Sequence, residues 1–190
     1  MKLLIITQKV DSGDSVLGFF HKWIEEFSKQ CESVTVIALG VGEYDLPKNV
    51  KVFSLGKERG NSLFSYIVIF YRLIWCERGN YDRVFVHMNQ IYVVLGGILW
   101  RLLSKPVGLW YVHRGKTFSL WIAEKLTDVI FTATPESFRI KSTKVHFMGQ
   151  AVDIEKFRQP LGKNSADKPF RIVSVGRLTP IKNLDTLIRA

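Results

Sequence analysis

Short apolar runs alternate with longer segments of helical periodicity along most of this 190-residue sequence. We expect strands at Lys2–Thr7, Val34–Leu39, Val50–Leu55, Arg83–His87, Val107–His113, Val129–Thr132 and Lys144–Met148. We expect helices at Ser15–Gln30, Leu63–Arg78, Asn89–Leu103 and Phe118–Leu126, and a helical turn from Pro135. Such alternation is typical of βα units that build a parallel sheet. The sequence therefore predicts an α/β fold: a doubly wound, Rossmann-like parallel sheet with helices on both faces and its first strand near the middle.

The end of the sequence has a different character. Residues 158–168 are polar and lack apolar periodicity, as expected of a linker. A new apolar run follows at Phe170–Val175, and a helix starting at Leu184 has room for only about two turns, whereas a typical helix has about 11 residues. We therefore expect a first domain over residues 1–157, a linker over 158–168, and the truncated start of a second domain over 169–190.

The charge balance limits the possible partners. The chain has 27 Lys and Arg against 17 Asp and Glu, a formal net charge of +10. Such a balance favours an anionic membrane surface, phosphorylated ligands or nucleic acid, and the alternative is a solvated basic surface without a partner. The cations are scattered singly and no nucleic-acid motif is present, so we expect no nucleic-acid partner.

The cysteines argue against a metal or disulfide framework. Cys31 and Cys76 have no second Cys or His at ligand spacing. The apolar start of the chain, Leu3–Ile6, is too short for a signal peptide. These features predict a cytoplasmic protein without a metal site.

The loop after the first strand carries the first candidate site residue. Its sequence, Thr7–Gly18, does not match G-x-G-x-x-G, which disfavours a dinucleotide cofactor. Gly13 could let the backbone approach a ligand, or it could be an ordinary turn glycine. Ser15 is expected to cap the following helix, whose free N–H groups attract anions.

Histidines end two neighbouring expected strands. His113 is followed by Arg114 and Lys116, so it could hydrogen-bond a ligand hydroxyl or phosphate at the carboxyl edge of the sheet. His87 is a weaker candidate for the same role, and either histidine could be structural. His21 and His146 are expected to lie on the surface or in packing contacts.

The last segment combines two cations with the start of a helix. Arg177 follows Gly176 at the end of an expected strand, and Lys182 precedes the helix that starts at Leu184. Guanidinium bonds, an ammonium charge and backbone donors together would form a clamp for a diphosphate.

Two motifs resemble a known family. Gly176-Arg177-Leu178-x-x-x-Lys182-Asn183-x-x-x-Leu187 is similar to the G-R-L-x-x-x-K-G/N-x-x-x-L-I segment of the GT-B retaining glycosyltransferases of family 4. Val145–Phe157, which ends in Val152-Asp153-Ile154-Glu155-Lys156-Phe157, resembles the strand and N-G-V-D-x-x-x-F crossing of that family. The resemblance spans the chain but is diffuse before residue 107.

The resemblance implies a hexosyltransferase-type enzyme that moves a sugar from a nucleoside-diphosphate-sugar to a hydroxyl of a glycan or lipid-linked acceptor, with retention and without metal or cofactor. Arg177 and Lys182 match the pair that holds the donor diphosphate, and His113 matches a histidine that contacts the donor sugar. Gly13 lies in a loop near acceptor and donor phosphate, and Asp11, Asp14 and Arg114 are expected to line the acceptor side. The paired-glutamate motif of the family would lie beyond residue 190, so the piece alone is expected to be inactive.

Two rival functions stay open at this point. One is a non-catalytic Rossmann-like module that binds phosphorylated sugars or a membrane surface, and the other is a UDP-sugar epimerase of GT-B fold. The helix from Leu63 to Cys76 is apolar nearly all round but falls short of the ~20 residues that span a bilayer. It is either a buried helix or an interfacial one with Arg72 and Arg78 near anionic headgroups, which would suit a peripheral protein on the inner membrane face.

Overall fold

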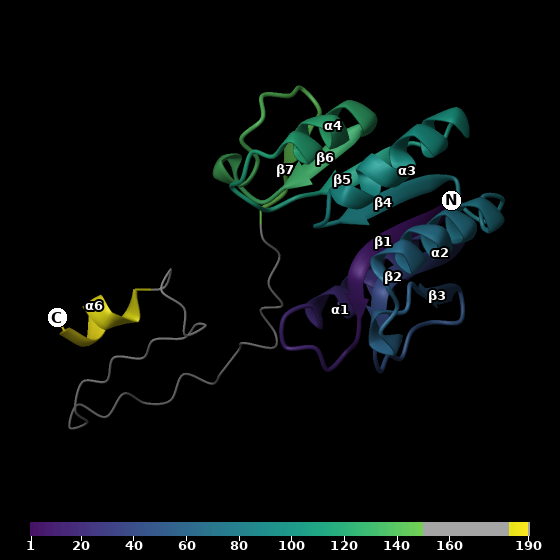
Figure 1. Ribbon diagram of the computed structural model, residues 1–190, viewed down its shortest axis with the longest axis horizontal. Coiled ribbons are helices and arrows are strands. Elements are labelled where there is room, and N and C mark those ends of the chain that lie inside the picture. The colour runs from purple at the N-terminus through teal and green to yellow at the C-terminus, as the bar shows by residue number, and fades with distance from the viewer. Residues whose placement is uncertain (150–182, 190) are drawn as a thin grey trace. The chain divides into compact units, whose positions relative to one another are not determined.

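A seven-stranded, fully parallel sheet forms the centre of the domain (Figure 1). The computed structural model describes residues 1–149 and 183–189. The strands are β1 (Lys2–Val10), β2 (Ser33–Val41), β3 (Val50–Ser54), β4 (Arg83–His87), β5 (Val107–Trp110), β6 (Val129–Thr132) and β7 (Val145–Phe147). The predicted α/β fold is confirmed.

The strand order is β3-β2-β1-β4-β5-β6-β7. Ile6 of β1 pairs with Ile37 of β2 on one side and with Val86 of β4 on the other. The chain therefore winds outward from β1 in one direction, returns, and winds outward from β4 in the other. In such sheets ligands bind outside the carboxyl ends of the strands where the winding reverses, which here is the point between β1 and β4.

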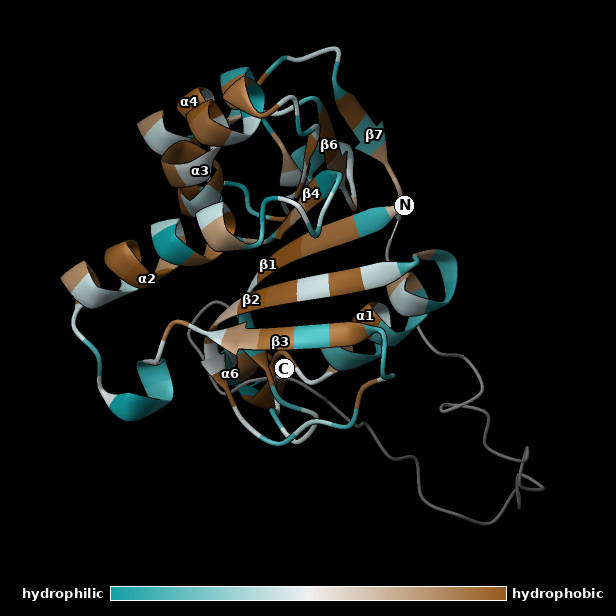
Figure 2. Cartoon of the chain, turned by 90° about the vertical axis from the view of Figure 1, so that its right-hand side faces the viewer, coloured by the Kyte–Doolittle hydropathy of each residue, from teal (hydrophilic) through white to brown (hydrophobic). Residues whose placement is uncertain are grey.

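Helices cover the two faces unequally. One face carries α1 (Phe19–Gln30), and the other carries α2 (Leu63–Cys76), α3 (Ile91–Leu102) and α4 (Phe118–Leu126), as Figures 1 and 2 show. Short 3-10 turns lie at Lys57–Arg59 (η1) and Pro135–Ser137 (η2). Each face has its own apolar cluster: Phe20 and Ile24 of α1 belong to one, whereas Phe70, Trp100 and Leu120 belong to the other.

The chain divides into two units, Met1–Ala151 and Val152–Ala190. The sheet and the helices just named belong to the first unit. In the second unit, the described residues are Asn183 and α6 (Leu184–Arg189), a short helix with no buried residue.

The first helix begins later than expected. Ser15 does not cap it, because residues 14–18 form a separate turn in which the Gly18 amide donates to the Asp14 carbonyl over 3.0 Å. Asp14 Oδ1 accepts hydrogen bonds from the amides of Val16 and Leu17 and so caps this turn, whereas Gly18, the N-cap of α1, has no side-chain capping bond. A Cβ at Gly18 would lie 2.5 Å from that same carbonyl oxygen, so the turn needs glycine there.

The second helix, α2, is only partly buried, so it is not the buried helix that was one of the two alternatives expected from its apolar sequence. Phe70 and Ile74 are its buried residues, and large apolar side chains elsewhere on it face solvent. Among the helices of the described residues, none has the length and apolar character needed to cross a membrane.

Candidate functional site

The loops that follow β1, β4, β5 and β6 meet the carboxyl edge of the sheet. The β4 and β5 loops are tied together, because Gln90 Nε2 donates to Ser119 Oγ over 3.1 Å at the start of α4. The Met88 amide donates to the Trp110 carbonyl, and the Tyr111 amide donates to the Phe131 carbonyl. The last two bonds extend the hydrogen bonding between neighbouring strands one residue beyond the ends of β4 and β5.

Lys9 organises the loop after β1. Its Nζ lies 2.9 Å from Asp11 Oδ2 and 2.8 Å from Asp14 Oδ2. The Lys9 hydrogen bond lowers the pKa of both carboxyls, with backbone amides adding to the effect, and brings the pKa of Asp14 to about 2. The two hydrogen bonds raise the pKa of Lys9 in turn. Asp14 is therefore ionised at neutral pH and is a weak proton acceptor. The loop supplies fixed charges to a ligand, but its carboxylates are poorly suited to act as a general base.

Asp11, Gly13 and Asp14 are predicted site residues, whereas Lys9 is not predicted from the sequence. The structure brings the three named residues together, and the Gly13 amide donates to Asp11 Oδ1 over 3.0 Å. A Cβ at Gly13 would make an ordinary 3.5 Å contact with that oxygen, so the fold itself does not require glycine there. The sequence pattern that could have predicted this cluster is the spacing of Lys9, which precedes Asp11 by two residues and Asp14 by five.

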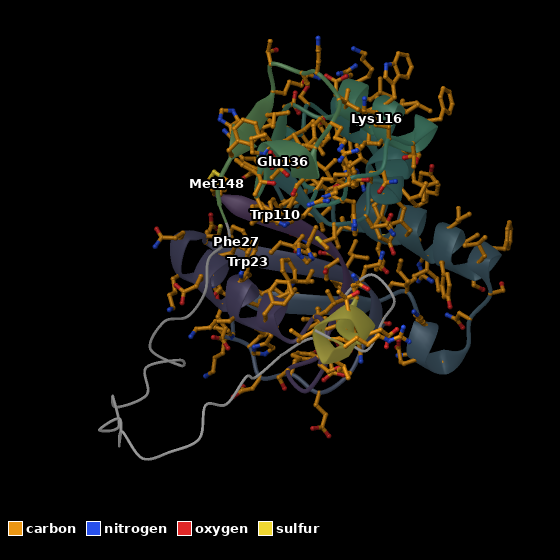
Figure 3. All side chains as sticks on the ribbon, turned by 90° about the vertical axis from the view of Figure 1, so that its left-hand side faces the viewer. Trp23, Phe27, Trp110, Lys116, Glu136 and Met148 are labelled. Carbon is orange, nitrogen blue, oxygen red and sulfur yellow. The ribbon has the colours of Figure 1, made fainter. Side chains whose placement is uncertain are left out.

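His113 and Arg114 lie on the loop between β5 and α4. The strand ends at Trp110 rather than at His113, and both side chains are exposed. The His113 ring packs edge-on against Tyr111, with centroids 5.4 Å apart. Glu136, on the turn after β6, has its pKa lowered by its own backbone amide and by Thr134, with Arg114 contributing through its charge. Figure 3 labels Lys116, the next cation of this loop, together with Glu136.

His87 is a packing residue. It is fully buried at the end of β4, its ring is stacked on Phe20 with centroids 3.7 Å apart, and its Nδ1 lies 3.2 Å from Thr7 Oγ1. Burial lowers the pKa of His87 to about 3, so the ring is neutral. Its Nε2 has no hydrogen-bond partner in the part of the chain that the structure describes.

On the α1 face, aromatic residues of α1 pack against aromatic residues of β4 and β5. Trp23 of α1 and Trp110 of β5 lie side by side in Figure 3, with ring centroids 5.0 Å apart in an edge-on contact. Phe27 of α1 contacts Phe85 of β4 at 5.2 Å. No sequence pattern predicts this arrangement, because residues on α1 are brought to strands far along the chain only by the winding of the sheet.

Arg177 and Lys182, the predicted diphosphate clamp, lie outside the described residues. Within residues 1–149 and 183–189, no group of three His, Cys, Asp or Glu side chains is placed to hold a metal ion. A cavity of about 210 Å³ lies at the opposite, amino edge of the sheet, where Val107 begins β5. Asp128 and Arg101 in its wall bond to the backbone of Val107 and Lys125, so these groups serve the fold.

Comparison with known proteins gives matches in structure alone. No family model and no curated protein sequence matches the chain. Anabaena HepE in complex with UDP matches at a TM-score of 0.60 and 14% identity, over 85% of this chain and 47% of HepE. The lipopolysaccharide outer core galactosyltransferase WaaB matches at 0.58 and 15% identity, over 100% of this chain and 58% of WaaB. MurG of Acinetobacter baumannii matches at 0.52 and 16% identity, over 89% and 50%.

The chain thus spans about half the length of the solved structures that it matches. At sequence identities this low, the structural similarity is evidence of a shared fold alone. The sheet order and the matches together establish that residues 1–149 have the Rossmann-like architecture of a GT-B domain.

Proposed function

We propose that this chain is the acceptor-side domain, with the start of the donor-side domain, of a glycosyltransferase that uses a nucleoside-diphosphate-sugar. The observation that carries the proposal is the GT-B sheet, whose reversal point between β1 and β4 adjoins a loop of fixed charges. HepE, which has a similar fold, has been solved with UDP and with UDP-glucose. WaaB is named a galactosyltransferase.

The motif at the end of the sequence supports the family 4 and retaining character of the proposed hexosyltransferase. Arg177 and Lys182 would bind the donor diphosphate and stabilise the charge that develops as the nucleotide leaves. His113 would orient the donor sugar from the β5 loop. In such a reaction the departing phosphate helps to deprotonate the acceptor, which fits an Asp14 carboxyl whose pKa of about 2 makes it a poor base. No metal or cofactor is part of the proposal.

The proposed acceptor is a hydroxyl of a sugar or of a lipid-linked glycan. Asp11, Asp14 and Arg114 would line its side of the site, with Gly13 near the donor phosphate. The proposed location is cytoplasmic and peripheral, on the inner face of a membrane.

The clamp is tested in the protein encoded by the complete reading frame around this sequence, with a panel of nucleotide-sugars. Arg177→Ala and Lys182→Ala should each lower kcat more than they raise the donor KM, because the clamp acts mainly on charge that grows in the transition state. Loss of a comparable preorganised donor costs about 3 kcal/mol, or on the order of a hundredfold in rate. Lys182→Arg should rescue only in part, since a planar fork does not replace a compact ammonium.

Arg158→Ala, in the expected linker, is the matched control and should retain wild-type turnover. Wild-type turnover in both clamp variants would remove the main support for the proposed reaction. A donor that is converted to its epimer without an acceptor would assign the protein to the epimerases instead.

A further inference from the structure

Three helices on one face of the domain expose apolar stripes. On α2, Phe64, Val68, Tyr71 and Trp75 recur at intervals of four, three and four residues, and all four are exposed. Ile91, Ile98 and Leu102 continue the same spacing on α3, with half-buried Leu95 between them. Intervals of three and four place side chains on one side of a helix. These stripes are therefore continuous strips of apolar surface rather than scattered residues.

The fourth helix adds an aromatic pair. Phe118 and Trp121 of α4 are 77% and 51% exposed, and their rings are stacked with centroids 6.2 Å apart. Single exposed apolar residues are normal on protein surfaces, but an extended apolar face indicates an interaction site.

The three stripes belong to one layer. Tyr71 of α2 donates its hydroxyl to the Leu95 carbonyl of α3 over 2.8 Å, and Arg101 of α3 donates to the Lys125 carbonyl of α4 over 3.0 Å. Figure 2 shows hydrophobic colouring on all three helices, which lie together on the face of the sheet opposite α1. We call this surface, formed by the exposed residues of α2, α3 and α4, the three-helix face.

The charges on the three-helix face have one sign. Arg72, Arg101 and Lys125 lie on its helices, and all are exposed. The sequences of the three helices contain a single carboxylate, Glu124, which is 5% exposed and accepts a hydrogen bond from Ser142. An ordinary solvent-facing helix carries both signs of charge on its outer side. Here Glu124 lies 3.2 Å from Lys125 Nζ and half-buried Glu77 follows α2, but the exposed charged side chains within the three helices are all cations. Apolar stripes with such an excess of exposed cations are complementary to an apolar layer with anionic groups at its border.

Arginine and tryptophan occur together at the end of α2. The Arg78 guanidinium lies 4.4 Å from the centre of the Trp75 ring and donates to the Trp75 carbonyl. Lys125 Nζ lies 5.8 Å from the centre of the Trp121 ring. Tryptophan and tyrosine are enriched at the level of lipid headgroups, where a cation beside them meets phosphate.

We propose that the three-helix face docks on the surface of a bilayer that contains anionic lipids. The helices would lie in the interface with Phe64, Ile98 and Phe118 inserted and the cations at the headgroups. The proposal deepens the membrane location in the proposed function, but it rests on this face and not on the sugar-transfer reaction. A second copy of the chain is the poorer occupant, because a two-fold contact through this face would bring together two surfaces whose exposed charges are both positive.

The test is co-sedimentation of the full 190-residue chain with vesicles of phosphatidylcholine, with and without phosphatidylglycerol. Wild type should bind the anionic vesicles, bind pure phosphatidylcholine far more weakly, and bind less as salt is raised. A chain with Phe64→Ser, Ile98→Ser and Phe118→Ser should bind at least about tenfold more weakly, because each change removes a large apolar side chain from the bilayer. The matched control is Tyr44→Ser, an exposed aromatic residue away from the three helices, and it should bind like wild type.

A second pair of variants tests the charges and does not depend on the folding of the first. Arg72→Gln with Arg78→Gln should weaken binding to anionic vesicles several-fold, whereas Lys48→Gln with Lys51→Gln, which changes the net charge equally, should weaken it less. Wild type that ignores anionic vesicles, or a serine variant that binds as well as wild type, would overturn the proposal. Self-association that the serine changes abolish, without vesicle binding, would assign the face to a second copy. None of these readouts uses a sugar donor, so they fail or succeed independently of the transfer reaction.

Discussion

At the scale of single residues, His87 shows how a fold uses a residue type that is common in active sites. Its position at the end of β4, beside the reversal point, is where a ligand-binding histidine would stand. Its ring is instead covered by Phe20 and fully buried, which holds it neutral. Position at a strand end could be predicted from the sequence, whereas burial depended on α1 arriving from elsewhere in the chain.

Replacement of His87 by Gln should change how stability depends on pH. In the folded protein burial lowers the pKa of His87 from 6.5 to about 3, so between those values the unfolded chain binds a proton that the folded chain does not. Stability from the neutral ring is therefore complete above about pH 6.5 and is lost as the pH falls toward 3. The loss is about 1.4 kcal/mol of unfolding free energy per pH unit within that range.

Urea unfolding at a series of pH values measures this slope. His87→Gln should flatten the slope between about pH 6 and pH 4. An unchanged slope in His87→Gln would mean that the ring is not buried as described.

At the scale of elements, the apolar runs located every strand of residues 1–149, but the strand ends depended on particular contacts. The expected apolar run at Phe170–Val175 lies outside the described residues. β1 continues past the expected Thr7 to Val10, because Lys9 and Val10 still pair with Gly40 and Val41 of β2. The start of α1 moved because the Asp14 side chain caps an extra turn, and a sequence offers several polar residues that could do so. The exposed side of α2 could not be predicted either, since a helix that is apolar all round has no polar face to mark the solvent side.

The contact between α3 and α4 depends on a glycine. A Cβ at Gly97 would lie 2.8 Å from Cβ of Leu126, so alanine there must push the two helices apart. We expect Gly97→Ala to destabilise the domain by about 1–3 kcal/mol, because overpacking outweighs the ~1 kcal/mol that alanine gains over glycine in a helix.

Gly79→Ala is the control for that substitution. A Cβ at Gly79 would meet no atom within 4 Å, so the change should alter the unfolding free energy little. Thermal and urea unfolding of both variants measure the change in unfolding free energy. A Gly97→Ala domain as stable as wild type would show that α3 and α4 are less closely packed than described.

At the scale of the whole molecule, the winding of the sheet could be predicted but the site could not. Alternating strands and helices, with right-handed crossovers, leave few arrangements other than a doubly wound sheet. The sheet then fixes which loops share its carboxyl edge, and on that basis Asp11, Asp14, His113 and Arg114 were named. How Lys9 joins the two aspartates, and how far His113 lies beyond the end of β5, are set by loop conformations that no periodicity encodes.

The C-terminal boundary of the first domain can be tested by shortening the chain. The sequence predicts a domain over residues 1–157, whereas the compact unit is Met1–Ala151. Both apolar clusters draw their described residues from positions 3–145, so a chain that ends at residue 151 should keep the core intact. We expect chains ending at 151 and at 157 to unfold at the same temperature as the 190-residue chain. For a domain of this size a loss of 1 kcal/mol shifts Tm by roughly 2–4 °C. If the chain that ends at 157 matches the full chain while the one that ends at 151 falls by more than that, residues 152–157 are part of the first domain, and its boundary lies where the sequence predicts.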